Sequence, residues 1–196
     1  MGTFSIVLLV VLAGLVMYVI GLYNTLQQLK TQITAAIQEI GNQLKRQASL
    51  IPNLMESVKS YLKHESGIYD KLTAARTSAT KASQTNSPAD LDKAISSMQS
   101  LIPDIKVLVE SNPELQANST VMKFMDELTD TSDKLMYSRR TVIDLTQMFN
   151  EKLVMFPSNL IAGMFGFKAE KGLEMPTEGE HLTVSHDETK DVKVDL

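Results

Sequence analysis

The sequence predicts an all-α protein in which a single N-terminal transmembrane helix continues into an antiparallel up-and-down four-helix bundle, followed by a disordered acidic tail. Residues 4–22 form an apolar run inside an uncharged stretch of 29 residues. Beyond it, hydrophobic residues recur three and four positions apart, as on amphipathic helices. This spacing stops after Lys168. We therefore expect an anchor at 1–24, a helical bundle at 25–168 and a tail at 169–196.

The apolar run has the length of a membrane span. At ~1.5 Å of rise per residue, residues 4–22 reach roughly 28 Å, close to the hydrocarbon thickness of a bilayer. A cleaved signal peptide is the alternative. It is disfavoured because no Lys or Arg precedes the run, the run exceeds the ~7–15 residues of a typical signal core, and no A-x-A-like site follows. The residues expected to face lipid are Phe4, Ile6, Leu8, Leu12, Leu15, Val19 and Leu22.

Charge and cysteine content bear on how the anchor is placed. Lys30 is the basic residue nearest the span and none precedes the span, which favours a cytoplasmic body by the positive-inside rule. The chain has no cysteine, which excludes a lipoprotein-type anchor and any disulfide. We expect a single-pass protein of the cell membrane whose bundle lies in the cytoplasm.

The first two bundle helices are predicted from the apolar stripe and the prolines. No proline interrupts the chain before Pro52, so the span should run into a rod of roughly 45 residues, about 70 Å long. The rod should end or kink at Pro52, because the residue before a proline is pushed out of the α region. Gly21 and Gly41 are the expected bending points. The second helix is then expected over residues 54–79.

The third and fourth helices have clear beginnings. Ser87 should cap the third helix with Pro88 at its first position, and the helix should close near Asn112. Asn118 or Ser119 should cap the fourth, whose seam steps by three and four over a long distance, as in coiled-coil packing. Its seam residues are Val121, Met125, Leu128, Ser132, Leu135, Arg139, Val142, Thr146, Phe149, Leu153 and Phe156.

Three charged residues interrupt the apolar stripes. Glu65 and Arg76 belong to the second predicted helix, and Arg139 occupies a seam position in the fourth. They are candidates for a partly buried ion network that fixes the register of the helices. A polar ligand site between helices and side chains that extend into solvent are the alternatives.

The segment after the fourth helix is the most exposed apolar stretch outside the span. Pro157 should stop the helix and Ser158 should cap a short new one. The segment either covers one end of the bundle or contacts a membrane or a partner, with Lys168 at the headgroup edge. A membrane contact there would lie about 70 Å along the chain from the span, on a neighbouring bilayer if the rod stands upright. The residues concerned are Phe156, Leu160, Ile161, Met164, Phe165 and Phe167.

Several motifs resemble those of the LemA family of bacterial proteins. They are FPSNLIAGMFGFK at 156–168, LKRQASLIPNLMESVKSYLKHE at 44–65 and NPELQAN at 112–118, together with Tyr23-Asn24 and Arg76. The resemblance implies an N-terminal anchor and a four-helix bundle. Many members carry a lipoprotein-type Cys before the Tyr-Asn pair; its absence here favours a retained transmembrane helix. A relative in magnetosome-forming bacteria is associated with membrane organelle formation, and for most members no molecular activity is established.

Composition and motifs argue against catalysis and nucleic-acid binding. The sequence has no H-E-x-x-H, G-x-S-x-G or P-loop motif, and the body is neutral, since the net charge of −4 resides from Lys168 onward. We expect no enzyme activity, cofactor or metal. The expected function is a self-associating scaffold, a homo-oligomer with lipid as partner. The alternatives are a tethered adaptor or sensor that binds a membrane protease or envelope-stress component, and a small-ligand or metal carrier at Glu65, Arg76 and Arg139.

Overall fold

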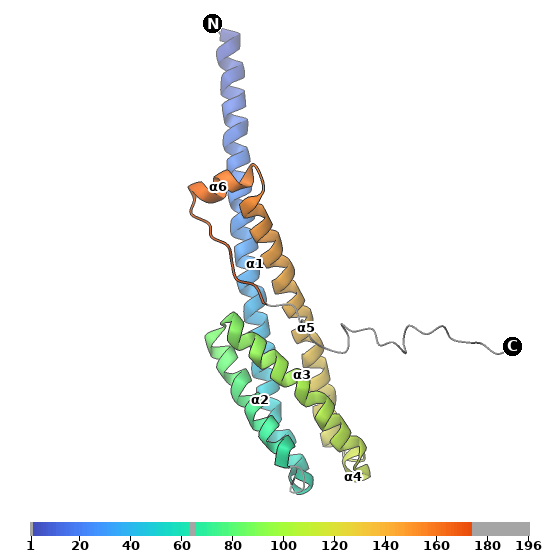
Figure 1. Ribbon diagram of the computed structural model, residues 1–196. Helices are drawn as coiled ribbons and strands as arrows, with labels where there is room; N and C mark the ends of the chain where they lie inside the picture. Colours follow the sequence, from blue (N-terminus) through green and yellow to red (C-terminus); the bar gives the residue numbers. More distant parts are fainter. Residues whose placement is uncertain (1, 63–65, 174–196) are drawn as a thin grey trace, which may run out of the picture.

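The computed structural model describes residues 2–62 and 66–173, and every regular element in these ranges is a helix (Figure 1). The all-α prediction is therefore confirmed for the described residues. The elements are α1 (Gly2–Leu62), α2 (Ser66–Thr85), α3 (Pro88–Glu110), α4 (Pro113–Gln116), α5 (Ser119–Val154) and α6 (Ser158–Met164).

Helix α1 is longer than the sequence predicted. It contains 61 residues, about 90 Å at ~1.5 Å per residue, and passes through Pro52 without ending. Pro52 removes one backbone hydrogen bond, but Ile51 and Leu54 on either side are fully buried, and their packing holds the chain helical. Of the predicted end or kink at Pro52, the end is therefore wrong, and the second helix begins at Ser66 instead of residue 54.

Helices α2 and α3 form a hairpin against the half of α1 that lies far from the N-terminus (Figure 1). The backbone N–H of Asp90 donates to Ser87 Oγ at 3.3 Å, and Pro88 occupies the first turn, as predicted. Asp90 also accepts hydrogen bonds from the Lys81 amine and the Thr85 and Ser87 hydroxyls. These bonds, Lys81 first, lower the pKa of the Asp90 carboxyl.

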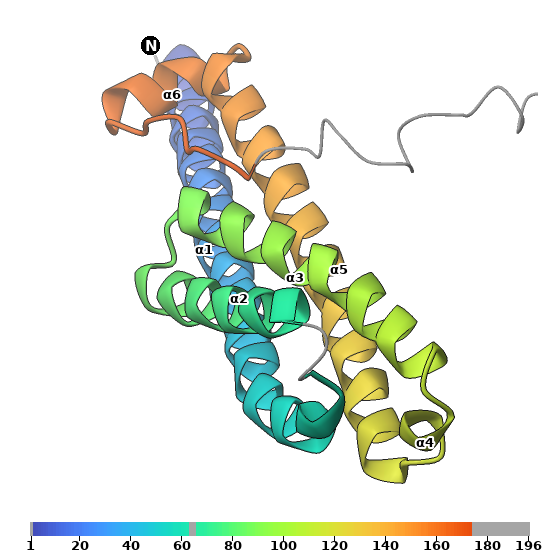
Figure 2. The same cartoon turned by 60° about the horizontal axis from the view of Figure 1, so that its bottom comes forward.

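Helix α5 runs antiparallel to α1 along nearly the whole body, beside the α2–α3 hairpin (Figure 2). Its cap is Asn118, whose Oδ1 accepts from the N–H groups of Thr120 at 3.0 Å and Val121 at 3.3 Å. Most of the predicted seam is buried. Thr131 is buried in place of the half-buried Ser132, and Phe156 is 81% exposed. The seam therefore ends before Phe156.

The core has two parts. The larger one lies where α1, α2, α3 and α5 meet, and includes Leu54, Leu101 and Leu135. The smaller one lies between α1, α5 and α6, nearer the N-terminus. It consists of Leu26, Leu29, Ile33, Phe149 and Ala162. We call the part of the body around the smaller cluster, next to the span, the upper body, and the part around the larger cluster the lower body. The upper body is held mainly by the two long helices α1 and α5, whereas the lower body is held by α1, α2, α3 and α5.

The chain after α6 turns back along the body. The Glu170 N–H donates to Asn150 Oδ1 at 3.0 Å, the Glu170 carboxylate pairs with Lys30 at 3.2 Å, and Leu173 is buried. The expectation of disorder from residue 169 is therefore wrong for residues 169–173, because these contacts hold them. Residues 174–196 of the predicted tail lie outside the described residues.

Candidate membrane-facing site

The N-terminal part of α1 extends beyond the other helices (Figure 1), and the predicted anchor residues from Phe4 to Leu15 are exposed on it. Leu8 and Leu12 are each 57% exposed and Leu15 is 60% exposed, although all three are strongly apolar. Val19 and Leu22, near the end of the run, are partly buried. Within residues 2–62 and 66–173, α1 is the one helix whose length and composition suit a membrane crossing, and its apolar window has no buried residue.

Helix α6 lies against α1 at the point where the apolar run ends (Figure 1). The Tyr23 ring is 4.8 Å from that of Phe165 and 5.7 Å from that of Phe167, centroid to centroid. Phe167 in turn meets Phe149 edge-on at 6.2 Å. The predicted separation of about 70 Å between this segment and the span is therefore wrong, because antiparallel α5 returns the chain to the base of the span.

One side of this segment packs on the body and the other remains exposed. Ile161 and Ala162 are buried, and Phe167 is half-buried. Six apolar side chains, here called the collar, are between 53% and 81% exposed. The collar consists of Val154, Met155, Phe156, Leu160, Met164 and Phe165. Covering the bundle end thus uses about half of the segment and leaves the other half available for contact.

Two local features set the geometry of the collar. Ser158 Oγ donates to the carbonyls of Lys152 at 2.6 Å and Met155 at 2.9 Å, so it closes the end of α5. The predicted role of Ser158 as the cap of α6 is therefore wrong, since Pro157 occupies that position. Gly166 has φ of +71°, a conformation that favours glycine, and its turn directs Phe167 back under α6.

Charged residues bracket the collar. The sequence from Leu153 to Phe167 carries no charge, and Lys152 and Lys168 flank it on either side. The Lys30–Glu170 pair joins α1 to the segment after α6. The surface therefore changes from apolar to charged at the base of the collar.

The three residues of the predicted ion network do not all lie within the described chain. Arg139 is buried on α5, and its Nη2 is 3.2 Å from Oδ1 of Asp92 on α3. Arg76 is exposed on α2, and Glu65 lies outside the described residues, so the network of three stays a prediction. The partner Asp92 was missed; the signal for it was an acidic residue directly after the seam residue Leu91.

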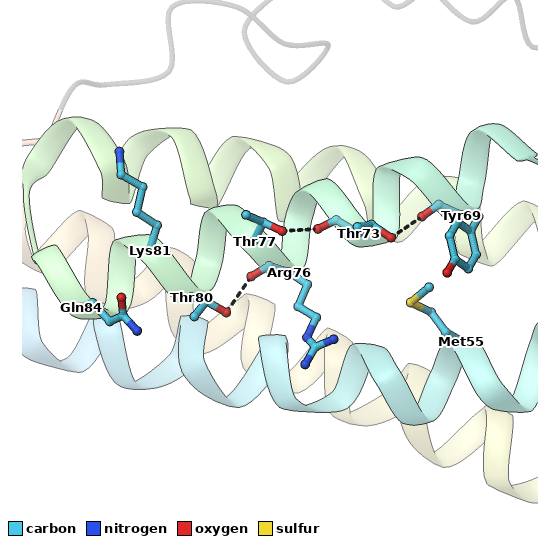
Figure 3. A pocket seen from close by; sticks show the side chains of 8 residues that line it. All are labelled: Met55, Tyr69, Thr73, Arg76, Thr77, Thr80, Lys81 and Gln84. Carbon is cyan, nitrogen blue, oxygen red and sulfur yellow. Dashed lines mark hydrogen bonds between the residues drawn. The ribbon is translucent and has the colours of Figure 1, made fainter.

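Arg76 lines a groove of about 550 Å³ beside α2 (Figure 3). The hydroxyls of Thr73, Thr77 and Thr80 donate to backbone carbonyls of their own helix, so the polar groups left for a ligand at this wall include the guanidinium of Arg76. The described residues that line the groove include no His, Cys, Asp or Glu. Among the residues that the structure describes, no group of His, Cys, Asp and Glu is arranged to hold a metal ion.

The fold and this site define a class of protein, a helical body on a long helix whose first part is apolar and uncovered. The family model for the LemA family matches residues 36–186, which include the whole collar. The chain belongs to the LemA family, as the sequence motifs predicted. LemA is not a known enzyme family, and membership together with the apolar helix fits a membrane-associated protein. No curated protein matches the sequence.

Proposed function

We propose that this protein is a non-enzymatic single-pass protein of the cell membrane that self-associates as a scaffold and organises or shapes the membrane. Its body lies in the cytoplasm. The observation that carries this proposal is the continuity of α1. One uninterrupted helix contains both the apolar segment from Leu8 to Leu15 and the core residues Leu44 and Leu54. The span and the body are therefore joined by a continuous helix, without a flexible linker.

The packing of α5 supports this mechanical role. Phe149 lies in the core that α5 forms with α1, and Arg46 pairs with Glu127 across the same interface. Bending α1 inside the body would break these contacts. A tilt imposed on the body by neighbouring copies is therefore passed to the span, and through it to the lipid.

Self-association is supported by the surface of the span. Gly14 and Gly21 lie two turns apart on α1, and a Cβ added at either would meet nothing within 4 Å. Small residues spaced along one face let transmembrane helices approach closely, where packing and hydrogen bonds hold them together. This face is available to a second copy of the chain.

Cryo-electron microscopy of the full-length protein in mild detergent or native lipid particles tests the proposal. A closed ring or cage that encloses lipid is the expected result. The variant G14L/G21L should reduce particles to monomers or small oligomers, while A13L, on another face of the same span, should leave them unchanged. Isolated monomers of the unaltered chain would overturn the scaffold.

One observation favours the alternative of a tethered adaptor or sensor. A groove of about 390 Å³ lies between α3 and α5, far from the span, and is lined by Met122, Met125 and Val109 among others. Methionine-lined grooves adapt readily to partner surfaces. A monomer or dimer in detergent, combined with a partner lost on the substitution Met122→Glu, would favour the adaptor.

A further inference from the structure

We infer that the collar is a lipid-binding surface that lies in the interfacial zone of the same leaflet from which the span emerges. The inference rests on the proposed function, in which α1 crosses a bilayer, and specifies which other part of the chain touches that bilayer. Its partner is a phospholipid surface, bound through apolar side chains and flanking lysines.

The depth of the collar follows from its contacts with α1. Tyr23 directly follows the apolar run, which is where interfacial aromatic residues of a span are found. The Phe165 ring lies 4.8 Å from the Tyr23 ring, so both occupy the same level along α1. Phe165 must therefore share whatever environment surrounds Tyr23.

The exposed side chains are continuous with the span. Met164 is 77% exposed and Phe156 81% exposed, and both belong to the segment that packs around the base of the uncovered part of α1 (Figure 1). Exposed apolar patches of this kind mark sites of contact with membrane or protein. Here the patch adjoins the exposed apolar part of α1, which suits the hydrocarbon of a bilayer. A membrane is therefore favoured over a protein as the partner of the collar.

The distribution of charge supports the same assignment. The stretch from Leu153 to Phe167 is uncharged, while Lys152 and Lys168 stand at its two ends. Lysine stems can lie along the acyl boundary while their amines reach headgroup phosphates. The Lys30–Glu170 pair, 3.2 Å apart, joins α1 to the segment after α6 on the charged side of this boundary. The order along α1 is thus apolar span, aromatic and apolar collar, and charged residues.

The absence of tryptophan from the sequence permits a direct test. Full-length single-tryptophan variants M164W, L9W and Y137W would be reconstituted in vesicles of phosphatidylcholine and phosphatidylglycerol. The vesicles carry acyl chains brominated either near the headgroup or near the bilayer centre. Met164 represents the collar, Leu9 the span, and Tyr137, which is 76% exposed in the middle of α5, the water-facing body.

Shallow bromines should quench M164W roughly twofold more than deep bromines, as expected for a helix seated ~5–10 Å into the interface. Deep bromines should quench L9W more strongly, and neither should quench Y137W. Quenching of L9W without quenching of M164W would overturn the collar inference and leave the span intact. Absence of quenching at L9W would instead overturn the proposed function.

A second collar variant, F156W, guards against a local effect of one substitution and should follow M164W. A second copy of the chain is the competing occupant. It would give a blue-shifted M164W emission that no bromine quenches and that reverts when the protein is diluted in lipid. That result would also overturn the inference.

Discussion

Arg139 occupies a seam position that an apolar residue would normally fill. Its side chain is 7% exposed and pairs with Asp92, whose side chain is 23% exposed. A buried guanidinium needs a partner, because removing one member of such a pair leaves an uncompensated charge. The pair therefore fixes α5 against α3 and permits a charge in the seam.

The substitution Asp92→Ala should lower the free energy of unfolding by about 2–4 kcal/mol, measured by urea unfolding of the full chain in mild detergent. Asp133→Ala removes an exposed carboxylate from α5 and should change stability by less than about 0.5 kcal/mol. The double variant D92A/R139M should recover much of the loss. Equal stability of D92A and D133A would contradict a stabilising role for the pair.

Gln47 is fully buried on α1, and its Oε1 and Nε2 have no hydrogen-bond partner among the described residues. Leaving such groups unpaired costs free energy in the folded state. Gln47→Leu should therefore raise the free energy of unfolding by about 1–3 kcal/mol. Gln38→Leu, at an exposed position of the same helix, serves as the control. A destabilised Gln47→Leu would show that the amide meets a polar partner in the native assembly.

At this scale the sequence identified residues better than it identified partners. Arg139 departed from the seam pattern and was recognised, whereas Asp92, 47 positions away, could not be matched to it by local spacing. Hydrophobicity likewise marked both Ile161 and Met164. Which of the two is buried depends on where α6 meets α1, and no local pattern contains that information.

The beginnings of α3 and α5 were predictable, whereas the passage of α1 through Pro52 was not. Ser87-Pro88 and Asn118 act on N–H groups within three residues, so local sequence determines them. At Pro52 the local preference for a break competes with the burial of Ile51 and Leu54 against other helices. Tertiary packing outweighs the local preference at Pro52, so α1 continues to Leu62 and the next helix begins at Ser66.

The junction between α2 and α3 should show a defined pH dependence. Hydrogen bonds from Lys81, Thr85 and Ser87 lower the pKa of the Asp90 carboxyl from its ordinary value. A carboxyl whose pKa is lower in the folded than in the unfolded state stabilises the fold fully when the pH is above its unfolded-state pKa. This contribution is lost as the pH falls through its folded-state pKa. The melting temperature of the native chain should thus exceed that of Asp90→Asn by a constant amount from pH 5 to 8. The difference should shrink below about pH 4.

Thermal melts followed by circular dichroism at closely spaced pH values would measure this difference. The other carboxyl groups titrate in both proteins, so their effects cancel in the comparison. A difference between native chain and Asp90→Asn that stays unchanged down to pH 3 would show that Asp90 acts through its shape instead of its charge.

The whole molecule is organised by the matching lengths of α1 and α5. Helix α5 has 36 residues, which matches the 37 residues of α1 from Leu26 to Leu62 to within one. An antiparallel partner of that length necessarily ends at the base of the span. The composition predicted both helices, and an up-and-down bundle by itself returns the last helix to the end where the span emerges. The contact of α6 with α1 at Tyr23 depends on tertiary packing, which no local pattern contains.

The two core clusters should differ in stability, because two long helices hold the upper body and four hold the lower. Phe149 is fully buried at the centre of the upper cluster. Replacing a buried Phe by Ala costs about 3–5 kcal/mol, so Phe149→Ala should speed amide exchange in α5 beyond residue 141 and in α1 at 24–33 by roughly two to three orders of magnitude. Helix α3, in the lower cluster, should exchange as in the native chain.

Hydrogen exchange with mass spectrometry on the full chain in lipid nanodiscs would measure these regions separately. Met148→Ala, at the neighbouring and 49% exposed position, should leave every region unchanged. If Phe149→Ala accelerated α2 and α3 as strongly as the upper body, the protein would unfold as one cooperative unit. Regional acceleration would show instead that the collar and the span rest on a part of the body that can open while the four-helix part stays closed. Such an arrangement would let the membrane-facing end adjust to lipid without unfolding the rest.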